Sequence, residues 1–219
     1  GKLTHGWTTS WGTSTRMMGG LFMTHSDDDG LILPPIVAPY QIVVIPITRE
    51  ENEKELNACA NKLAEQLRTK GIRVLVDDTD ARAPDKMWKW IKRGVPLRVE
   101  IGAKEMADNT LTVTRRDLGK SSKTTVAVEH FINDVQNMLD TIQHDMLIAV
   151  EKRNKTMIHD VKDLKELESA LESGKIGFFR IKYDLTTNEE FDGLIEKYKI
   201  SRRCLDDKDP NFVFVAKSY

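Results

Sequence analysis

The stretch Tyr40-Gln-Ile-Val-Val-Ile-Pro-Ile47 is short, rich in β-branched residues and apolar on both faces. Such a run is typical of a central strand that is covered on two sides. After it, apolar residues recur at helical spacing through 56–67, Gly71 stands in a C-terminal stop position, and 72–76 repeats the strand pattern. The order strand, helix, strand with short links predicts a parallel pair joined by a crossover helix.

The segments around this unit extend the α/β pattern. Strand-like segments at 95–101, 110–114 and 124–128 precede a long helix with an apolar face. That face carries Phe131, Val135, Leu139, Ile142 and Met146. Further on, a helix within 160–173, a strand at 176–181, a helix at 188–198 and a strand from Phe212 predict a small third domain. The expected fold class is therefore α/β.

Composition excludes several classes of protein. The 219 residues carry 33 Lys and Arg against 34 Asp and Glu, and this net charge of -1 excludes a bulk polycation but allows a local basic face. The two cysteines, Cys59 and Cys204, cannot build a disulfide framework, and no Cys or His set has zinc-ligand spacing. We expect a reducing, cytoplasmic location. Prolines interrupt the most apolar stretch, 31–47, and 1–12 lacks signal-peptide features, so no membrane passage is expected.

The densest basic region lies between Arg82 and Arg98. Lys86, Lys89 and Arg93 share one helical face there, with Trp88 nearby, while Trp90 points inward. A cationic face beside an aromatic ring is able to hold phosphates and stack a base, and the alternative is an ordinary solvated helix face. The run 118–121 resembles the end of a phosphate loop, but Thr114 stands where its first glycine is required.

A second candidate site lies in the first zone. Small and hydroxyl-bearing residues at 8–15 precede Arg16, and an apolar run with glycines follows. This order suits a strand that meets an anionic ligand and passes into a helix, since Arg offers forked donors to phosphate. A turn with a surface arginine is the alternative.

Several motifs together resemble one family. The segment TSWGTSTRMMGGLFMTHSDDDG, then VLVDDTDARAP, WIKRGVPLRVEIGAKE and the terminal FVFVAKSY are similar, in this order, to the C-terminal part of prolyl-tRNA synthetases. These are class II aminoacyl-tRNA synthetases, and the type resembled is the eukaryotic and archaeal one. The resemblance implies the end of the catalytic antiparallel sheet with motif 3 at 1–38, an anticodon-binding domain with a mixed sheet flanked by helices at 39–154, and a C-terminal α+β domain at 155–219.

The resemblance implies the activity of a proline–tRNA ligase. Such an enzyme activates L-proline with ATP and Mg²⁺ to prolyl-adenylate, transfers it to tRNA(Pro), and is expected to be a homodimer. Arg16 matches the motif 3 arginine that holds the ATP phosphates, with Ser14 and Thr15 beside it. The positions that match the proline and adenylate pocket are Ser10, Trp11 and Gly12. This stretch alone is expected to be inactive, and the alternatives are a freestanding, inactive tRNA-binding module or an α/β interaction protein without RNA.

The resemblance also implies anticodon readers and a changed C-terminal domain. Arg98, Lys104 and Glu105 match residues that read the two anticodon guanines, and Lys89 is a substitute reader because Ile91 stands where the family has Glu. Many relatives bind zinc through four cysteines, but the first pair is replaced within 179–184, so we expect no zinc. The Tyr219 carboxylate is expected to turn toward the active site, and its alternative is an ordinary strand end.

Overall fold

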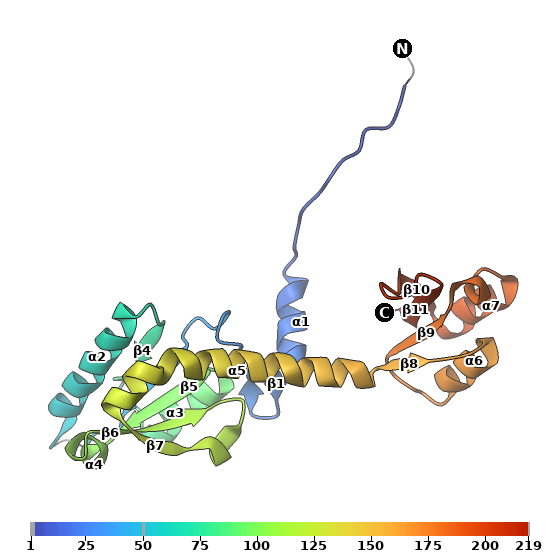
Figure 1. Cartoon of the computed structure of the whole chain (residues 1–219). Coiled ribbons are helices and arrows are strands. Elements are labelled where there is room, and N and C mark those ends of the chain that lie inside the picture. Colours follow the sequence, from blue (N-terminus) through green and yellow to red (C-terminus); the bar gives the residue numbers. More distant parts are fainter. Residues whose placement is uncertain (1–2, 50, 219) are drawn as a thin grey trace. The chain divides into compact units, whose positions relative to one another are not determined.

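The computed structural model describes residues 3–49 and 51–218, which divide into two compact units between Leu147 and Ile148. Figure 1 shows both units and labels most of their helices and strands. No helix among the described residues is long and apolar enough to cross a membrane.

The first unit is built on a five-stranded mixed sheet in the order β4-β3-β5-β6-β7. Its strands are β3 (Ile42–Pro46), β4 (Val74–Val76), β5 (Leu97–Ile101), β6 (Thr110–Arg115) and β7 (Thr124–Ala127). β3 pairs in parallel with β4 and β5, whereas β5 with β6 and β6 with β7 are antiparallel. The predicted strand, helix, strand unit is confirmed, since α2 (Glu53–Thr69) connects β3 to β4.

Helices cover both faces of this sheet. α2 and the long α5 (Val128–Thr156) share one core with Ile42, Val44 and the odd-numbered residues of β5. α3 (Ala83–Lys92) covers the opposite face, where Trp90 packs with Val43 and Ile45. Because successive side chains of a strand point to opposite faces, β3 is buried on both, as its apolar run predicts.

The first zone contributes one helix and a short hairpin. Residues 3–14 form neither helix nor strand, α1 (Arg16–Thr24) follows, and β1 (Ser26–Asp27) pairs antiparallel with β2 (Gly30–Leu31). The helix after Arg16 is as predicted. The strand expected before it is not formed, because a strand needs a neighbouring strand for its backbone groups and no described segment pairs with 3–14.

The second unit is a four-stranded sheet in the order β10-β11-β9-β8. Its elements are β8 (Ile158–Asp160), α6 (Leu164–Glu172), β9 (Phe178–Lys182), the 3₁₀ turn η2 (Tyr183–Thr186), α7 (Glu189–Tyr198), β10 (Ile200–Leu205) and β11 (Phe212–Lys217). The side chains of Asp163 and Asn188 cap α6 and α7 by accepting hydrogen bonds from backbone N–H groups. The predicted helices and the strands β9 and β11 are confirmed, and β8 and β10 are additional.

Candidate nucleic-acid interface

A cavity of about 350 Å³ opens between α3 and the sheet face that α3 covers. Its lining comes from α3, β5, β6, the 3₁₀ turn η1 (Gly119–Ser122) and the residue after that turn. The lining residues are Pro84, Met87, Trp88, Ile91, Arg98, Glu100, Thr114, Lys120 and Lys123. Alternation along β5 places Arg98 and Glu100 on the same face, and Arg98 lies opposite Thr114 in the ladder with β6.

Two polar atoms in this cavity are buried without a hydrogen-bond partner. Arg98 is 5% exposed and its Nε has no partner, and the same is true of the Thr114 Oγ1 at 2% exposure. Burial lowers the pKa of Arg98, Glu100 opposes that shift, and Arg116 adds to it. Since buried polar groups in folded proteins are almost always paired, these two atoms are available for a ligand that enters the cavity.

The cavity also holds one carboxylate and two ammonium groups. Glu100 is 8% exposed, and its Oε2 accepts a hydrogen bond of 2.8 Å from Lys123 Nζ. Lys120 and Lys123 come from η1 and the position after it, so the turn presents both cations at the same wall. At the rim, the Trp88 side chain is 44% exposed, and Lys92 Nζ lies 5.4 Å from its ring centroid. An exposed aromatic ring beside cations is a surface on which a base can stack.

The basic face expected on α3 is only partly formed. Lys86 is 3% exposed and its Nζ donates to the Asp77 carbonyl oxygen at 3.1 Å, so this lysine points inward, contrary to the prediction. Lys89 Nζ lies 3.0 Å from Asp77 Oδ2, and the Trp90 indole N–H donates to the same oxygen at 2.5 Å. Asp77 therefore holds one face of α3 against the end of β4. The side chains on that face stabilise the fold.

This hydrogen-bond network keeps the Asp77 carboxylate ionised. Burial on its own raises the pKa of Asp77, but hydrogen bonds from Thr79, Lys89 and Trp90 lower it to about 2. Asp77 is therefore ionised at neutral pH and neutralises Lys89. Lys89 does not line the cavity, and its assignment as an anticodon reader stays a prediction.

Lys104 and Glu105 lie on α4 (Ala103–Ala107), outside the lining of the cavity. Glu105 Oε2 accepts a hydrogen bond from Gly102 N at 3.1 Å and Oε1 accepts one from Thr112 Oγ1 at 3.2 Å. Hydrogen bonds from backbone N–H groups, its own first, lower the pKa of Glu105. The carboxylate therefore serves as the cap of its own helix. Lys104 is exposed.

Three of the residues that match motif 3 by resemblance lie at a different cavity. Ser14 and Arg16 line a cavity of about 690 Å³ together with Gly12 and one side of α1. Thr15 directly precedes α1, and Met18 N donates to its carbonyl oxygen, while Ser10 and Trp11 lie in the exposed segment before the helix. Exposed hydroxyls and a guanidinium are chemically suited to the phosphates of ATP.

Metal binding has no preformed protein site in the described part of the chain. No group of three or more His, Cys, Asp or Glu residues there is arranged to hold a metal ion, and the cysteines, Cys59 on α2 and Cys204 on β10, are unpaired thiols. A Mg²⁺ ion bound with ATP would depend mainly on phosphate oxygens for its ligands. The absence of zinc stays a prediction.

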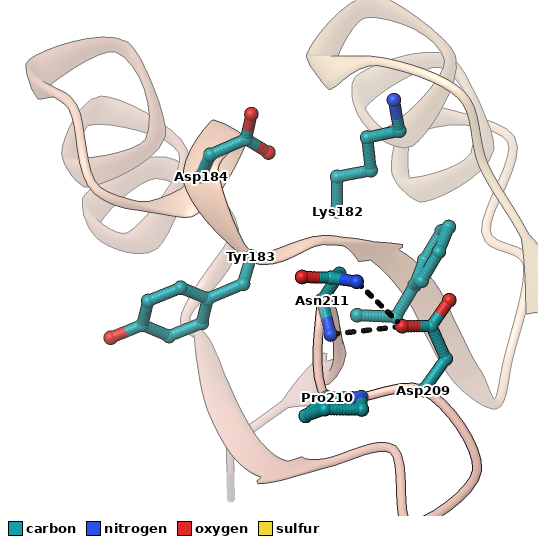
Figure 2. Close-up of a pocket in the computed structure, with 7 residues that line it drawn as sticks. Lys182, Tyr183, Asp184, Asp209, Pro210 and Asn211 are labelled. Carbon is teal, nitrogen blue, oxygen red and sulfur yellow. Dashed lines mark hydrogen bonds between the residues drawn. The ribbon is translucent and has the colours of Figure 1, made fainter.

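Residues 182–184, where the resemblance predicts the first cysteine pair of the family, line an open pocket in the second unit (Figure 2). Lys182, Tyr183 and Asp184 line one side of this pocket of about 450 Å³, and 209–212 lines the other. Asp209 Oδ1 accepts hydrogen bonds from the backbone N and the side-chain Nδ2 of Asn211 at 3.1 and 2.9 Å. These bonds hold the turn before β11 in place. Tyr219, which was expected to approach the active site, lies outside the described residues.

Comparison with known proteins gives consistent matches. A model of the family described as "Anticodon binding domain" matches residues 41–138. The chain is 39% identical over 207 residues to the proline–tRNA ligase of Flavobacterium johnsoniae, covering 94% of this chain and 41% of that protein. It is 41% identical over 183 residues to the chloroplastic and mitochondrial proline–tRNA ligase of Arabidopsis thaliana, covering 80% and 33%.

Solved structures match as well. The prolyl-tRNA synthetase of Cryptosporidium parvum, complexed with L-proline and AMP, superposes with a TM-score of 0.81 at 26% identity, covering 94% of this chain and 46% of that one. The Giardia lamblia enzyme in complex with prolyl-adenylate shares the fold with a TM-score of 0.83 at 24% identity, covering 94% and 47%. The chain thus spans less than half the length of each of these relatives.

Proposed function

Because residues 41–138 belong to the anticodon-binding domain family and the chain is related to the C-terminal portion of proline–tRNA ligases, we propose that it is the anticodon-reading part of such a ligase. Its parent enzyme activates L-proline with ATP and Mg²⁺ and transfers the prolyl group to tRNA(Pro). In this proposal 39–154 binds the anticodon, 1–38 completes the catalytic domain, and 155–219 is a C-terminal domain without zinc. The enzyme works as a homodimer in the cytoplasm.

The observation that carries the proposal is the buried, unpartnered Arg98 Nε beside the unpartnered Thr114 Oγ1. An exposed guanine presents O6 and N7 as acceptors and N1–H and N2–H₂ as donors. The cavity offers donors on Arg98 and Thr114 and an acceptor on Glu100, which matches both sets. Trp88 at the rim supplies a ring for stacking, and Lys120 and Lys123 supply cations for phosphate.

The exposed apolar side chains of the first zone support its place in a larger catalytic domain. Leu3, Trp7 and Trp11 are 104%, 103% and 92% exposed, and Met17 and Met23 on α1 are 69% and 79% exposed. Large apolar groups gathered in one segment mark a surface that another domain covers. Within that domain Arg16 binds the ATP phosphates, Ser14 and Thr15 contact the nucleotide, and Ser10, Trp11 and Gly12 line the pocket for proline and adenylate.

The alternative is a freestanding tRNA-binding module without catalysis. Arg16 argues against it, because a binding module has no use for an exposed guanidinium that matches an ATP ligand. The ligase and the binding module differ in the activity of the parent polypeptide. Proline-dependent exchange of pyrophosphate into ATP by the parent supports the ligase, whereas tRNA(Pro) binding without exchange supports the module. This chain alone is expected to give no exchange.

Binding of tRNA(Pro) to this chain tests the anticodon assignment. We expect the affinity to fall steeply as salt rises, and we expect Arg98→Ala to weaken binding by about 10-fold or more, the scale of one base contact. Arg202→Ala, which removes an exposed cation from the second unit, is the matched control and should change the affinity little. Equal affinity for tRNA(Pro) and for the same tRNA with both anticodon guanines replaced by adenines would refute the assignment.

A further inference from the structure

The cavity contains a single carboxylate, Glu100, which is a different residue from the Glu105 that the resemblance implies as a reader. Among the nine residues that line the cavity, Glu100 alone is acidic. Ile91 occupies the lining position at which the resemblance predicts a glutamate, and Glu105 is committed to the cap of α4. We propose that Glu100 is the specificity-determining residue that reads the donor edge of an anticodon guanine. This inference rests on the proposed function of the same cavity.

The position of Glu100 on β5 gives it a fixed relation to Arg98. The two residues are two positions apart on one face of a central strand, so their Cα atoms stand about 7 Å apart. β5 has strand neighbours on both sides, β3 and β6, which hold its backbone in place. A base that enters between α3 and this face meets a guanidinium and a carboxylate side by side. That pair matches the acceptor edge and the donor edge of one guanine.

Lys123 orients the Glu100 carboxylate and leaves some of its hydrogen-bond acceptor positions free. The 2.8 Å hydrogen bond from Lys123 Nζ uses one acceptor position on Oε2, and a carboxylate offers about four such positions. The Lys123 side chain is 54% exposed, whereas that of Glu100 is 11% exposed, so the carboxylate faces into the cavity and the lysine lies at its edge. The remaining acceptor positions are free for the N1–H and N2–H₂ groups of guanine.

The Glu100 carboxylate discriminates guanine from other purines by the hydrogen-bond donors that each purine offers. Adenine places the N1 lone pair where guanine has N1–H, so a lone pair faces the carboxylate and both groups remain unpaired. Inosine keeps N1–H and O6 but lacks the N2 amino group, so it loses one hydrogen bond to Glu100. The order of affinity expected at the position that enters the cavity is guanine, inosine, adenine.

The test uses the full chain and a synthetic hairpin RNA that carries the proline anticodon loop. Dissociation constants are measured at one fixed salt concentration for hairpins with guanine, or with inosine at each of the two guanine positions in turn. For the natural sequence we expect inosine at one of these positions to weaken binding by about 10-fold, the low end for a discriminating base contact. For Glu100→Gln we expect weaker binding of the guanine hairpin, and a guanine-to-inosine ratio below about threefold.

The matched control is Glu55→Gln on α2, because this exposed carboxylate lies outside the cavity and has no assigned role in binding. It should keep both the affinity and the guanine-to-inosine ratio of the natural sequence. Thermal unfolding of each variant shows whether it is folded, and the inosine measurement on the natural sequence needs no variant. No loss with inosine at either position, or full discrimination by Glu100→Gln, would overturn the role of Glu100 and leave the anticodon assignment standing. Failure of the natural sequence to bind the guanine hairpin would instead refute the proposed function itself.

Discussion

The Arg116 guanidinium forms a bidentate ion pair with the Asp27 carboxylate, with NH1 2.8 Å from Oδ2 and NH2 2.5 Å from Oδ1. Arg116 also donates to the carbonyl oxygens of Ile91 at 3.1 Å and Gly30 at 3.2 Å. One buried side chain thus joins the β1–β2 hairpin, which follows α1, to the end of α3 beside the proposed anticodon cavity. The two segments that carry the candidate sites are therefore connected by specific polar contacts.

Asp27→Asn is expected to destabilise the first unit by about 1 to 2 kcal/mol at pH 7. Removing one partner of a fully buried pair costs about 3 to 5 kcal/mol, but the Asp27 side chain is 42% exposed, so solvent reduces the effect. The hydrogen bond from Arg116 lowers the pKa of Asp27 below 3.8, with burial opposing. A lowered pKa in the folded state means that the stabilisation is complete above pH 3.8 and is lost as the pH falls further.

Urea unfolding of both proteins at pH 7 and near pH 3 checks this prediction. The difference between the natural sequence and Asp27→Asn should be largest at pH 7 and smaller near pH 3. Asp28→Asn is the control, since its exposed carboxylate lies one residue away. An equal effect of the two substitutions would show that the ion pair contributes no specific stability.

Gly94→Ala is expected to destabilise the same junction by about 2 to 4 kcal/mol. Gly94 has a φ of 70°, which costs a residue with a side chain about 1 to 2 kcal/mol, and an added Cβ would stand 2.6 Å from the Leu31 carbonyl carbon. Gly119→Ala is the matched control, because its φ is 67° but a Cβ there meets no atom within 4 Å. Thermal unfolding of the two variants separates the contact from the backbone conformation. If both variants lose the same stability, the packing between Gly94 and Leu31 is not tight.

The sequence was sufficient to predict the strands and helices with strong periodicity. It was insufficient to predict which residues pair with the charged side chains. β3 is predictable because its β-branched residues leave no polar face, whereas β10 was missed because Ser201, Arg202 and Arg203 hide the alternation of an edge strand. The outward prediction for Lys86 failed because Asp77, its partner, comes from another element. Glu100 was open to prediction, since alternation from Arg98 along an expected strand places both on one face.

Asp77→Asn is expected to loosen α3 from the sheet and destabilise the first unit by about 2 to 3 kcal/mol at pH 7. The Asp77 side chain is 1% exposed, but its partner Lys89 is 39% exposed, so the loss is smaller than for a fully buried pair. The pKa of Asp77 is about 2 in the folded state, against an ordinary value of 3.8. This stabilisation is therefore complete above pH 3.8 and is lost as the pH approaches 2. Urea unfolding near pH 7 and near pH 2.5 measures it. Asp78→Asn at the exposed neighbouring position is the control, and it should behave as the natural sequence does.

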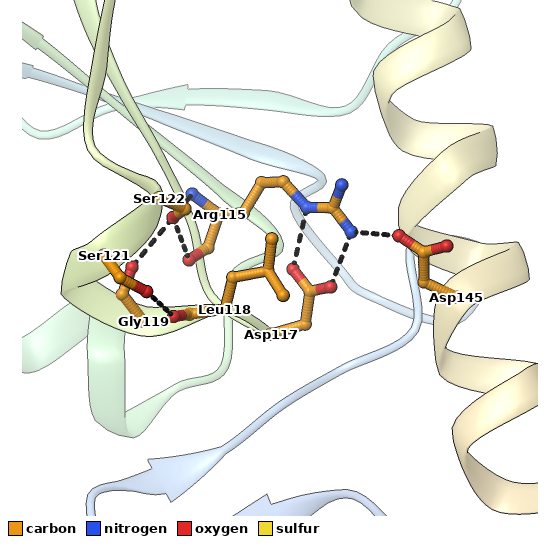
Figure 3. Close-up of polar contacts among 7 residues, drawn as sticks. All are labelled: Arg115, Asp117, Leu118, Gly119, Ser121, Ser122 and Asp145. Atoms are coloured by element: carbon orange, nitrogen blue, oxygen red, sulfur yellow. Dashed lines mark hydrogen bonds and ion pairs between the residues drawn. The ribbon is translucent and has the colours of Figure 1, made fainter. Parts of the chain in front are cut away.

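Polar contacts, shown in Figure 3, close the turn that carries Lys120 and Lys123 to the cavity. Ser122 Oγ accepts a hydrogen bond from Arg115 N at 3.0 Å and lies 3.1 Å from the Arg115 carbonyl oxygen and 2.8 Å from that of Gly119. Its single hydroxyl proton is shared between these two acceptors. Arg115 is itself fixed, because its guanidinium pairs with Asp117 and with Asp145 on α5, each at 2.7 Å. The side chain of Ser122 therefore closes the turn onto an anchored strand end.

Ser122→Ala is expected to weaken hairpin RNA binding by up to about fivefold. The loss of one net hydrogen bond, about 1 kcal/mol, lowers the ratio of ordered to disordered turn by that factor, and both lysines depend on this turn. Ser121→Ala removes a hydroxyl from the same turn, but Ser121 is exposed and donates only to the Leu118 carbonyl oxygen, so it should change the dissociation constant little. Titration of the guanine hairpin with both variants decides the matter. Equal weakening by the two variants would show that the contact of Ser122 with β6 has no special part in holding the turn.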